Sequence, residues 1–259
     1  MGATELSESA SAKFWQDRFA AHGNTGWFDR RIYAFDQRCR LGAFSQWLED
    51  QTFSGKLALD FGAGSGDFSR LLIDKGWRVV SYDKHVAPTF QHRTLQKASS
   101  AEVVAALAPF DLIVSITVLD HIMDNVEFCQ QLVDFRNWLK PDARFFFLEY
   151  SLAVARPPSS YQAFRTIETW KNALSDAKLH LEAIEPFFHP DEAPVPAWAF
   201  YNASLIARHH GRLRQLGVPL ALIPPLLAQA AETALRRHPY SAPATSPIHI
   251  LHGTTFGTS

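Results

Sequence analysis

Residues 57–72 read Leu-Ala-Leu-Asp-Phe-Gly-Ala-Gly-Ser-Gly-Asp-Phe-Ser-Arg-Leu-Leu, and this stretch decides the fold. Its apolar beginning is typical of a buried parallel strand, and its end has the spacing of an amphipathic helix. Between the two, Gly62, Gly64 and Gly66 allow a sharp backbone turn and the close approach of a ligand. The first N–H groups of the helix are expected to point at that ligand.

Two acidic residues accompany this glycine turn. Asp60 precedes the first glycine, and Asp83 ends the next apolar run, at residues 79–83. A carboxylate at position 60 is unfavourable beside a pyrophosphate but favourable near an ammonium group, and one at position 83 can accept hydrogen bonds from both hydroxyls of a ribose. A dinucleotide fingerprint needs glycine where Asp67 stands, which argues against a nicotinamide oxidoreductase. The ligand indicated has a ribose and a positively charged amino-acid end, as S-adenosylmethionine does.

Three further motifs follow in a recognisable order. Residues 110–115 (Phe-Asp-Leu-Ile-Val-Ser) read as a fourth strand, residues 118–122 (Val-Leu-Asp-His-Ile) as the loop after it, and residues 139–150 as a turn into a fifth strand. With these motifs the sequence resembles the class I S-adenosylmethionine-dependent methyltransferases over roughly residues 55–190. The resemblance implies an α/β fold with a Rossmann-like, seven-stranded, mostly parallel sheet, whose last two strands form an antiparallel hairpin.

The resemblance also implies S-adenosylmethionine as the cofactor and places its contacts on these motifs. One motif departs from the family, because residues 95–99 (Leu-Gln-Lys-Ala-Ser) hold no acid for the adenine amino group. Gln96, Ser99 or a backbone carbonyl are the candidates for that contact. The expected cofactor contacts are Asp60, Gly62, Ala63, Gly64, Gly66, Asp83, Lys84, Ser115 and Val118.

Transfer to a hydroxyl or a protonated amine also requires a base, and His121 is the first candidate. The alternative is that His121 only packs against the cofactor loop. Tyr150 is a second candidate catalytic residue, and Glu149 a candidate contact to the acceptor, although both residues could belong to the rim of the core. Asp120, His121 and Asp124 could hold a divalent metal, but a loop capping a helix from about Asn125 explains them better, so no metal is expected.

The N-terminal region is expected to be a helical lid. Helices are predicted over residues 9–22 and 31–51, with Trp15, Trp27, Phe28 and Tyr33 as aromatic cover, although Trp15 fits core packing better. Trp27, Tyr33 and Tyr161 are the further candidate contacts to the acceptor, whereas Arg165 is expected to form a surface salt bridge.

The chain is predicted to be a single methyltransferase domain over residues 1–259. It divides into a helical lid (1–54), a cofactor-binding core (55–190), a helical insertion between the last two strands (191–245) and a closing strand (246–259). Within this scheme, residues 159–177 are predicted to be a helix, and residues 179–188 and 248–256 to be strands.

The composition narrows the function further. With a net charge of −1 the chain lacks the basic footprint of a nucleic-acid-binding protein. Its two cysteines suit a reducing compartment, and it shows no targeting or membrane-spanning segment, so a cytoplasmic location is expected. The expected function is O- or N-methylation of a small-molecule acceptor. A sugar, glycan or protein side chain as acceptor, a non-catalytic cofactor-binding partner subunit, and a homodimer stay open as alternatives.

Overall fold

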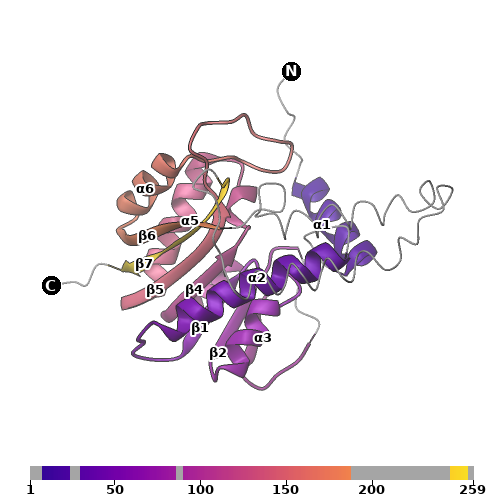
Figure 1. Ribbon diagram of the computed structural model, residues 1–259. Coiled ribbons are helices and arrows are strands. Elements are labelled where there is room, and N and C mark those ends of the chain that lie inside the picture. The colour runs from indigo at the N-terminus through magenta and orange to yellow at the C-terminus, as the bar shows by residue number, and fades with distance from the viewer. Residues whose placement is uncertain (1–7, 24–29, 86–89, 188–245, 256–259) are drawn as a thin grey trace, which may run out of the picture.

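The computed structural model describes residues 8–23, 30–85, 90–187 and 246–255. Seven strands form one sheet in the order β3-β2-β1-β4-β5-β7-β6 (Figure 1). All neighbours pair in parallel except β7, which is antiparallel to both β5 and β6. The predicted fold class is therefore confirmed. The strands are β1 (Leu57–Phe61), β2 (Arg78–Tyr82), β3 (Leu95–Ala98), β4 (Phe110–Ile116), β5 (Leu139–Tyr150), β6 (Leu179–Phe187) and β7 (Ile248–Thr255).

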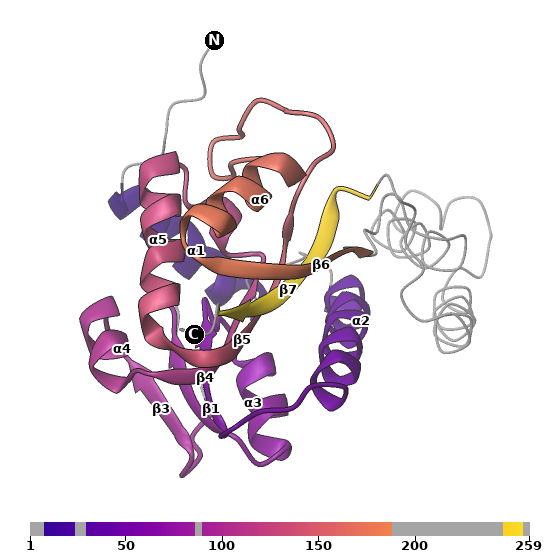
Figure 2. The ribbon, with the colours of Figure 1, turned by 90° about the vertical axis from the view of Figure 1, so that its left-hand side faces the viewer.

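Helices cover both faces of the sheet, since side chains along buried strands alternate between two cores. Phe146 and Leu148 of β5 belong to the core on one face, and Phe145 and Phe147 to the core on the other. Figure 2 shows α2 and α3 on one side of the sheet, and α4 and α5 on the opposite side. The helical elements are α1 (Glu8–His22), α2 (Arg30–Glu49), α3 (Asp67–Asp74), α4 (Ala101–Leu107), the 3-10 turn η1 (Leu119–His121), α5 (Asn125–Trp138) and α6 (Ile167–Asp176).

Helix α2 is fastened to the sheet by aromatic packing. The ring centroids of Phe44 and Trp47 lie 5.0 and 4.9 Å from that of Phe146 on β5. Large buried rings contribute most to the packing of such an interface. Helix α2 is thereby held against β5, which lies next to β4 in the sheet.

Helix α6 is shorter than the sequence pattern predicted. The helix expected over residues 159–177 begins only at Ile167, because Thr166 caps it by accepting a hydrogen bond from the Thr169 N–H at 3.1 Å. Residues 159–165 are not helical, and their polar groups bond to the loop after β4 instead. The prediction was wrong for that segment.

The predicted insertion, residues 191–245, lies outside the described residues. The two strands that flank it in the sequence are described, and Phe187 at the end of β6 pairs with Ile248 at the start of β7. The chain thus leaves and re-enters the sheet at one point. No helix in the described part of the chain is both long and apolar enough to cross a lipid bilayer.

Candidate active site

The glycine turn lies at the carboxyl end of β1, where ligands bind in open α/β sheets. Gly62, Gly64 and Gly66 have φ angles of 75°, 49° and 81°, a region that other residues rarely adopt. The N–H groups of Gly62 and Ala63 donate to the carbonyl of Tyr82 at 2.7 and 3.0 Å. These bonds tie the turn to the end of β2, so the turn has a defined position between two strands.

Asp83 lies directly after β2 and faces this turn. Its Oδ2 accepts a hydrogen bond from the Gly64 N–H, and its Oδ1 accepts one from the His85 N–H, both at 2.9 Å. The carboxylate is therefore oriented by the backbone beside the glycine turn. The neighbouring Lys84 is exposed.

Asp60, the last acid before the turn, is only 3% exposed. The Ser69 hydroxyl donates to its Oδ2 at 2.6 Å. Burial raises the pKa of Asp60 to about 6, and the charges of Asp83 and Asp67 act in the same direction. A cationic ligand group near this carboxyl would favour its ionised form.

Helix α2 reaches the glycine turn through Tyr33, which was expected on the acceptor side. The Tyr33 hydroxyl donates to Asp67 Oδ2 at 2.7 Å and lies 2.9 Å from the Ser65 hydroxyl. The Gln37 amide donates to the Tyr33 oxygen at 2.8 Å. Burial raises the pKa of Tyr33 to about 12, so the phenol stays protonated at neutral pH. Tyr33 therefore ties α2 to the glycine turn.

Arg40 is a site residue that the sequence did not reveal. Its guanidinium pairs with Asp36 on the same helix at 2.9 Å, and the two side chains are only 13% and 5% exposed. Arg40 also donates to the hydroxyl of Thr117, immediately after β4, at 3.1 Å. The i, i+4 spacing of Asp36 and Arg40 indicated an ion pair, but not its burial at the strand ends.

The glycine turn and the loop after β4 approach each other closely. A Cβ atom added to Gly62 would lie 2.2 Å from Cγ2 of Val118, so only glycine fits opposite this side chain. Ser115, another expected cofactor contact, is fully buried on β4, and its hydroxyl donates to Glu149 at 3.2 Å.

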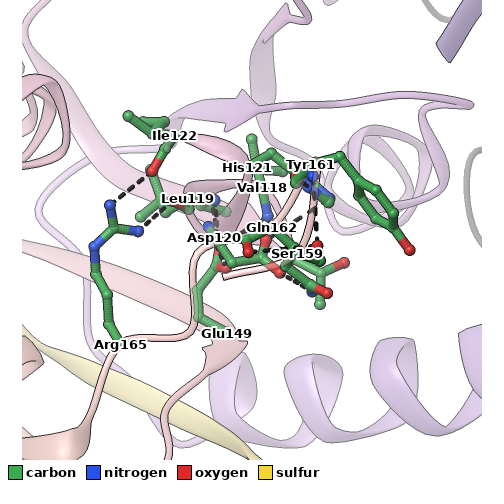
Figure 3. Close-up of polar contacts among 12 residues, drawn as sticks. Val118, Leu119, Asp120, His121, Ile122, Glu149, Ser159, Tyr161, Gln162 and Arg165 are labelled. Atoms are coloured by element: carbon green, nitrogen blue, oxygen red, sulfur yellow. Dashed lines mark hydrogen bonds and ion pairs between the residues drawn. The ribbon is translucent and has the colours of Figure 1, made fainter. Parts of the chain in front are cut away.

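Glu149 holds the loop after β4 instead of facing the acceptor. It is fully buried, and its Oε1 accepts hydrogen bonds from the N–H groups of Val118 and Leu119 at 3.0 and 3.1 Å (Figure 3). The Asp120 N–H donates to Oε2 at 3.4 Å. Burial, with the charge of Asp120 as a second cause, holds the pKa of Glu149 well above its usual range. The expected acceptor contact is thus corrected, since both carboxyl oxygens are used inside the protein.

Residues 159–165 hold the same loop from the other side, and we call this segment with Glu149 the loop clasp. Arg165 is 5% exposed and donates to the carbonyls of Leu119 and Ile122 at 3.1 and 2.6 Å (Figure 3). Its guanidinium carbon lies 3.8 Å from the ring centroid of Phe128. The predicted surface salt bridge of Arg165 was therefore wrong. The Gln162 amide donates to Asp120 Oδ2, and the Ala163 N–H to the Asp120 carbonyl.

The loop that the clasp holds carries one of the candidate catalytic side chains, that of His121. Its Nδ1 lies 2.8 Å from the carbonyl oxygen of Tyr161, which can only accept a hydrogen bond. Nδ1 therefore carries the proton in the neutral ring, and Nε2 keeps its lone pair. The ring packs edge-on against Trp15 of α1 at 4.7 Å and lies 5.9 Å from the Tyr161 ring.

Tyr150, the second candidate catalytic residue, lies at the end of β5. Burial raises its pKa above the usual range, so the phenol is a hydrogen-bond donor and a poor base. Its ring meets that of Phe164 edge-on at 5.7 Å. Trp27, the remaining predicted acceptor contact, lies outside the described residues.

The residues considered for a metal site have other roles. Asp124 caps α5 by accepting hydrogen bonds from the N–H groups of Val126 and Glu127 at 2.8 and 2.9 Å. Among the residues that the structure describes, no three His, Cys, Asp or Glu side chains gather as metal ligands.

Comparisons with known proteins identify the family of the chain. A family model described as a methyltransferase domain matches residues 33–191, more than half of the chain. No curated protein matches the chain in sequence.

Several solved structures are similar to the chain in fold. One is the 1,6-didemethyltoxoflavin-N1-methyltransferase of Burkholderia thailandensis, with 14% identity and a TM-score of 0.55 over 99% of this chain and 93% of that one. Phosphoethanolamine N-methyltransferase 2 of Haemonchus contortus has 14% identity and a TM-score of 0.53 over 96% and 58% of the two chains. Magnesium protoporphyrin IX methyltransferase of Synechocystis PCC 6803 has 15% identity and a TM-score of 0.51 over 69% and 92%.

Proposed function

The chain belongs to the class I S-adenosylmethionine-dependent methyltransferase family, and from this premise we propose that it methylates an oxygen or nitrogen of a small molecule. One observation carries the proposal: Gly62 lies against Val118. The turn that binds the cofactor and the loop that carries His121 are therefore neighbours. A methyl donor and a base can act on one acceptor only if they lie this close together.

S-adenosylmethionine is the cofactor, and it supplies an electrophilic methyl group on a sulfonium with a neutral leaving group. We assign its ribose to Asp83, whose carboxylate is already oriented beside the glycine turn. The buried carboxyl of Asp60 suits the ammonium end, and the guanidinium of Arg40 suits the carboxylate end, because Arg40 is held at Thr117 beside Val118.

His121 is the proposed general base. The Tyr161 carbonyl accepts a hydrogen bond from the protonated Nδ1, so Nε2 can accept a proton from a hydroxyl or an ammonium group. The aromatic rings of Phe14, Trp15 and Tyr161 gather around His121 and favour a small planar acceptor. Tyr150 lines the same strand end as a hydrogen-bond donor.

The similar structures include enzymes that methylate a small heterocycle and phosphoethanolamine, which supports a small-molecule acceptor here. A sugar, glycan or protein acceptor, a non-catalytic role with a partner, a homodimer and the cytoplasmic location stay predictions.

Calorimetric titration of the full chain with S-adenosylmethionine and S-adenosylhomocysteine tests the cofactor assignment. Replacing Asp83 by alanine should weaken both affinities by roughly ten- to a hundredfold, because a hydrogen bond to a charged group contributes about 1.5–3 kcal/mol. Asp74→Ala, at the exposed end of α3, is the matched control. An unchanged affinity in the Asp83 variant contradicts the assignment.

The acceptor is tested with methyl-labelled S-adenosylmethionine and a panel of small phenols, carboxylic acids and amines. Transfer of label to one class, lost in His121→Gln while S-adenosylhomocysteine still binds, supports the base. Full transfer by His121→Gln excludes His121 as the base.

A further inference from the structure

Asp120 holds a buried carboxylate with one unused oxygen. The side chain is 1% exposed, and Gln162 donates to its Oδ2. Its Oδ1 is buried and accepts no hydrogen bond from any described residue. This oxygen lies 3.8 Å from Nε2 of His121. Leaving a buried carboxylate oxygen without a donor costs free energy, and a positive charge on the facing imidazole would compensate that cost.

Glu149, and not the side chain of Asp120, accepts the hydrogen bonds of the N–H groups of this loop. The N–H groups of Val118, Leu119 and Asp120 all point at Glu149. Burial nevertheless raises the pKa of Glu149, and the neighbouring Asp120 adds to this effect. Oδ1 of Asp120 takes no part in these hydrogen bonds and lies on the side of His121.

We propose that Asp120 is the positioning residue and charge partner of His121, and that Gln162 holds its carboxylate toward the imidazole. The inference rests on the proposed role of His121 as base. In that step the proton moves from the oxygen or nitrogen of the acceptor to Nε2, which forms an imidazolium. Asp120 keeps its own charge throughout and lies close enough to stabilise the cation through space.

Two independent features of the structure support this arrangement. The Tyr161 carbonyl assigns the imidazole proton to Nδ1, so Nε2, which lies 3.8 Å from Asp120 Oδ1, is the nitrogen that takes up the second proton. Gln162 donates a hydrogen bond to Oδ2 of Asp120, which leaves Oδ1 of Asp120 on the side of the imidazole ring. The titratable and charged groups around His121 are Asp120 on its own turn, Tyr161 and Arg165 on the clasp segment, Glu149 on β5 and Arg18 on α1, which lies over Phe14.

The test is the titration of the His121 ring by ¹⁵N NMR in the full chain, with and without S-adenosylhomocysteine. Its signals are assigned by their loss in His121→Gln. In the unchanged protein the neutral ring should carry its proton on Nδ1. In Asp120→Asn, which keeps the shape and an oxygen for Gln162, the midpoint of the titration should move down by about one pH unit, because the neighbouring charge is gone.

Asp134→Asn is the matched control. Asp134 on α5 also accepts a hydrogen bond from a glutamine amide, that of Gln130 at 3.0 Å, but on the surface. This variant should leave the His121 midpoint unchanged. A purely structural role of Asp120 predicts a lower melting temperature in Asp120→Asn with the midpoint unmoved.

An unmoved midpoint overturns the proposal while leaving the proposed function intact. An Nε2-protonated neutral ring in the unchanged protein also overturns it, even if Asp120→Asn does not fold. Failure to bind S-adenosylhomocysteine, by contrast, contradicts the proposed function. Once an acceptor is found, the acidic limb of the rate–pH profile should move to lower pH in Asp120→Asn.

Discussion

The two sides of the site are built by different means. The glycine turn is fixed mainly by its own backbone, with three left-handed glycines within five residues, and by bonds to Tyr82, 20 and 19 positions along the chain. The loop with His121 is fixed at long range, by Glu149, Gln162 and Arg165, which lie 29 to 46 positions away from the groups that they bind. Backbone conformation thus shapes the proposed cofactor side, whereas hydrogen bonds from buried side chains shape the proposed acceptor side. Substitutions on the two sides of the site should therefore have different effects on stability and binding.

The largest effect is expected at Gly62, where the two sides meet. Gly62→Ala combines left-handed strain with a Cβ atom 2.2 Å from Val118 Cγ2, so the free energy of unfolding should fall by about 3–5 kcal/mol. Gly76 has a similar φ of 81° but no atom nearer than 4.0 Å. Gly76→Ala should therefore cost only about 1–2 kcal/mol. Equal losses in urea unfolding would show that the contact with Val118 is unimportant.

The next largest effect is expected in the loop clasp. Glu149→Ala leaves the buried N–H groups of Val118 and Leu119 without an acceptor and should lower the free energy of unfolding by about 3 kcal/mol. Glu149→Gln keeps an oxygen in that place and resembles the protonated acid, so its loss should stay near 1 kcal/mol. If urea unfolding gives equal losses for both variants, Glu149 acts mainly through its charge.

The free energy of unfolding should depend on pH through Asp60, the acid beside the glycine turn. Its pKa is raised to about 6 in the folded chain, so the folded state holds a proton that the unfolded state has released. Asp60 therefore contributes about 2–3 kcal/mol to the free energy of unfolding. This contribution is fully present below about pH 4 and is lost as the pH rises to about 6. Asp60→Asn should lack this fall. Unfolding curves of both proteins from pH 4 to 7, with Asp74→Asn as control, measure the difference; parallel curves would contradict it.

The smallest effect is expected at Tyr33, which joins α2 to the cofactor side. Tyr33→Phe removes the bonds to Asp67 and Ser65 and should lower the free energy of unfolding by about 1 kcal/mol. It should also weaken S-adenosylhomocysteine binding by several-fold while leaving the His121 titration in place. A changed His121 titration would mean that α2 organises both sides.

The same difference explains what the sequence could predict. The glycine turn, the strands and the cap at Asp124 depend on short runs of neighbouring residues, so their patterns can be read along the chain. Arg165 was misassigned because its partners, the carbonyls of Leu119 and Ile122, exist only once the chain has folded. The position of a backbone carbonyl in the fold cannot be read from a sequence.

The helix prediction over residues 159–177 failed for a related reason. Residues 159–165 have no strong helix breaker of their own, yet their polar groups are used on another loop, and Thr166 starts the helix later. Arg40 was overlooked because it resembles any helical ion pair until the fold buries it at Thr117. Tertiary contacts, and not local propensity, decided all three cases.

The loop clasp has a consequence for the exchange of parts between related enzymes. Three separate segments, residues 118–122, Glu149 and residues 159–165, complete one another's hydrogen bonds. A chimera that receives only a foreign loop after β4 would bring in backbone groups for which Glu149 and Arg165 are not placed. Acceptor preference in this fold should thus be transplanted, and inherited, as a three-part unit, while the glycine turn can be left where it is.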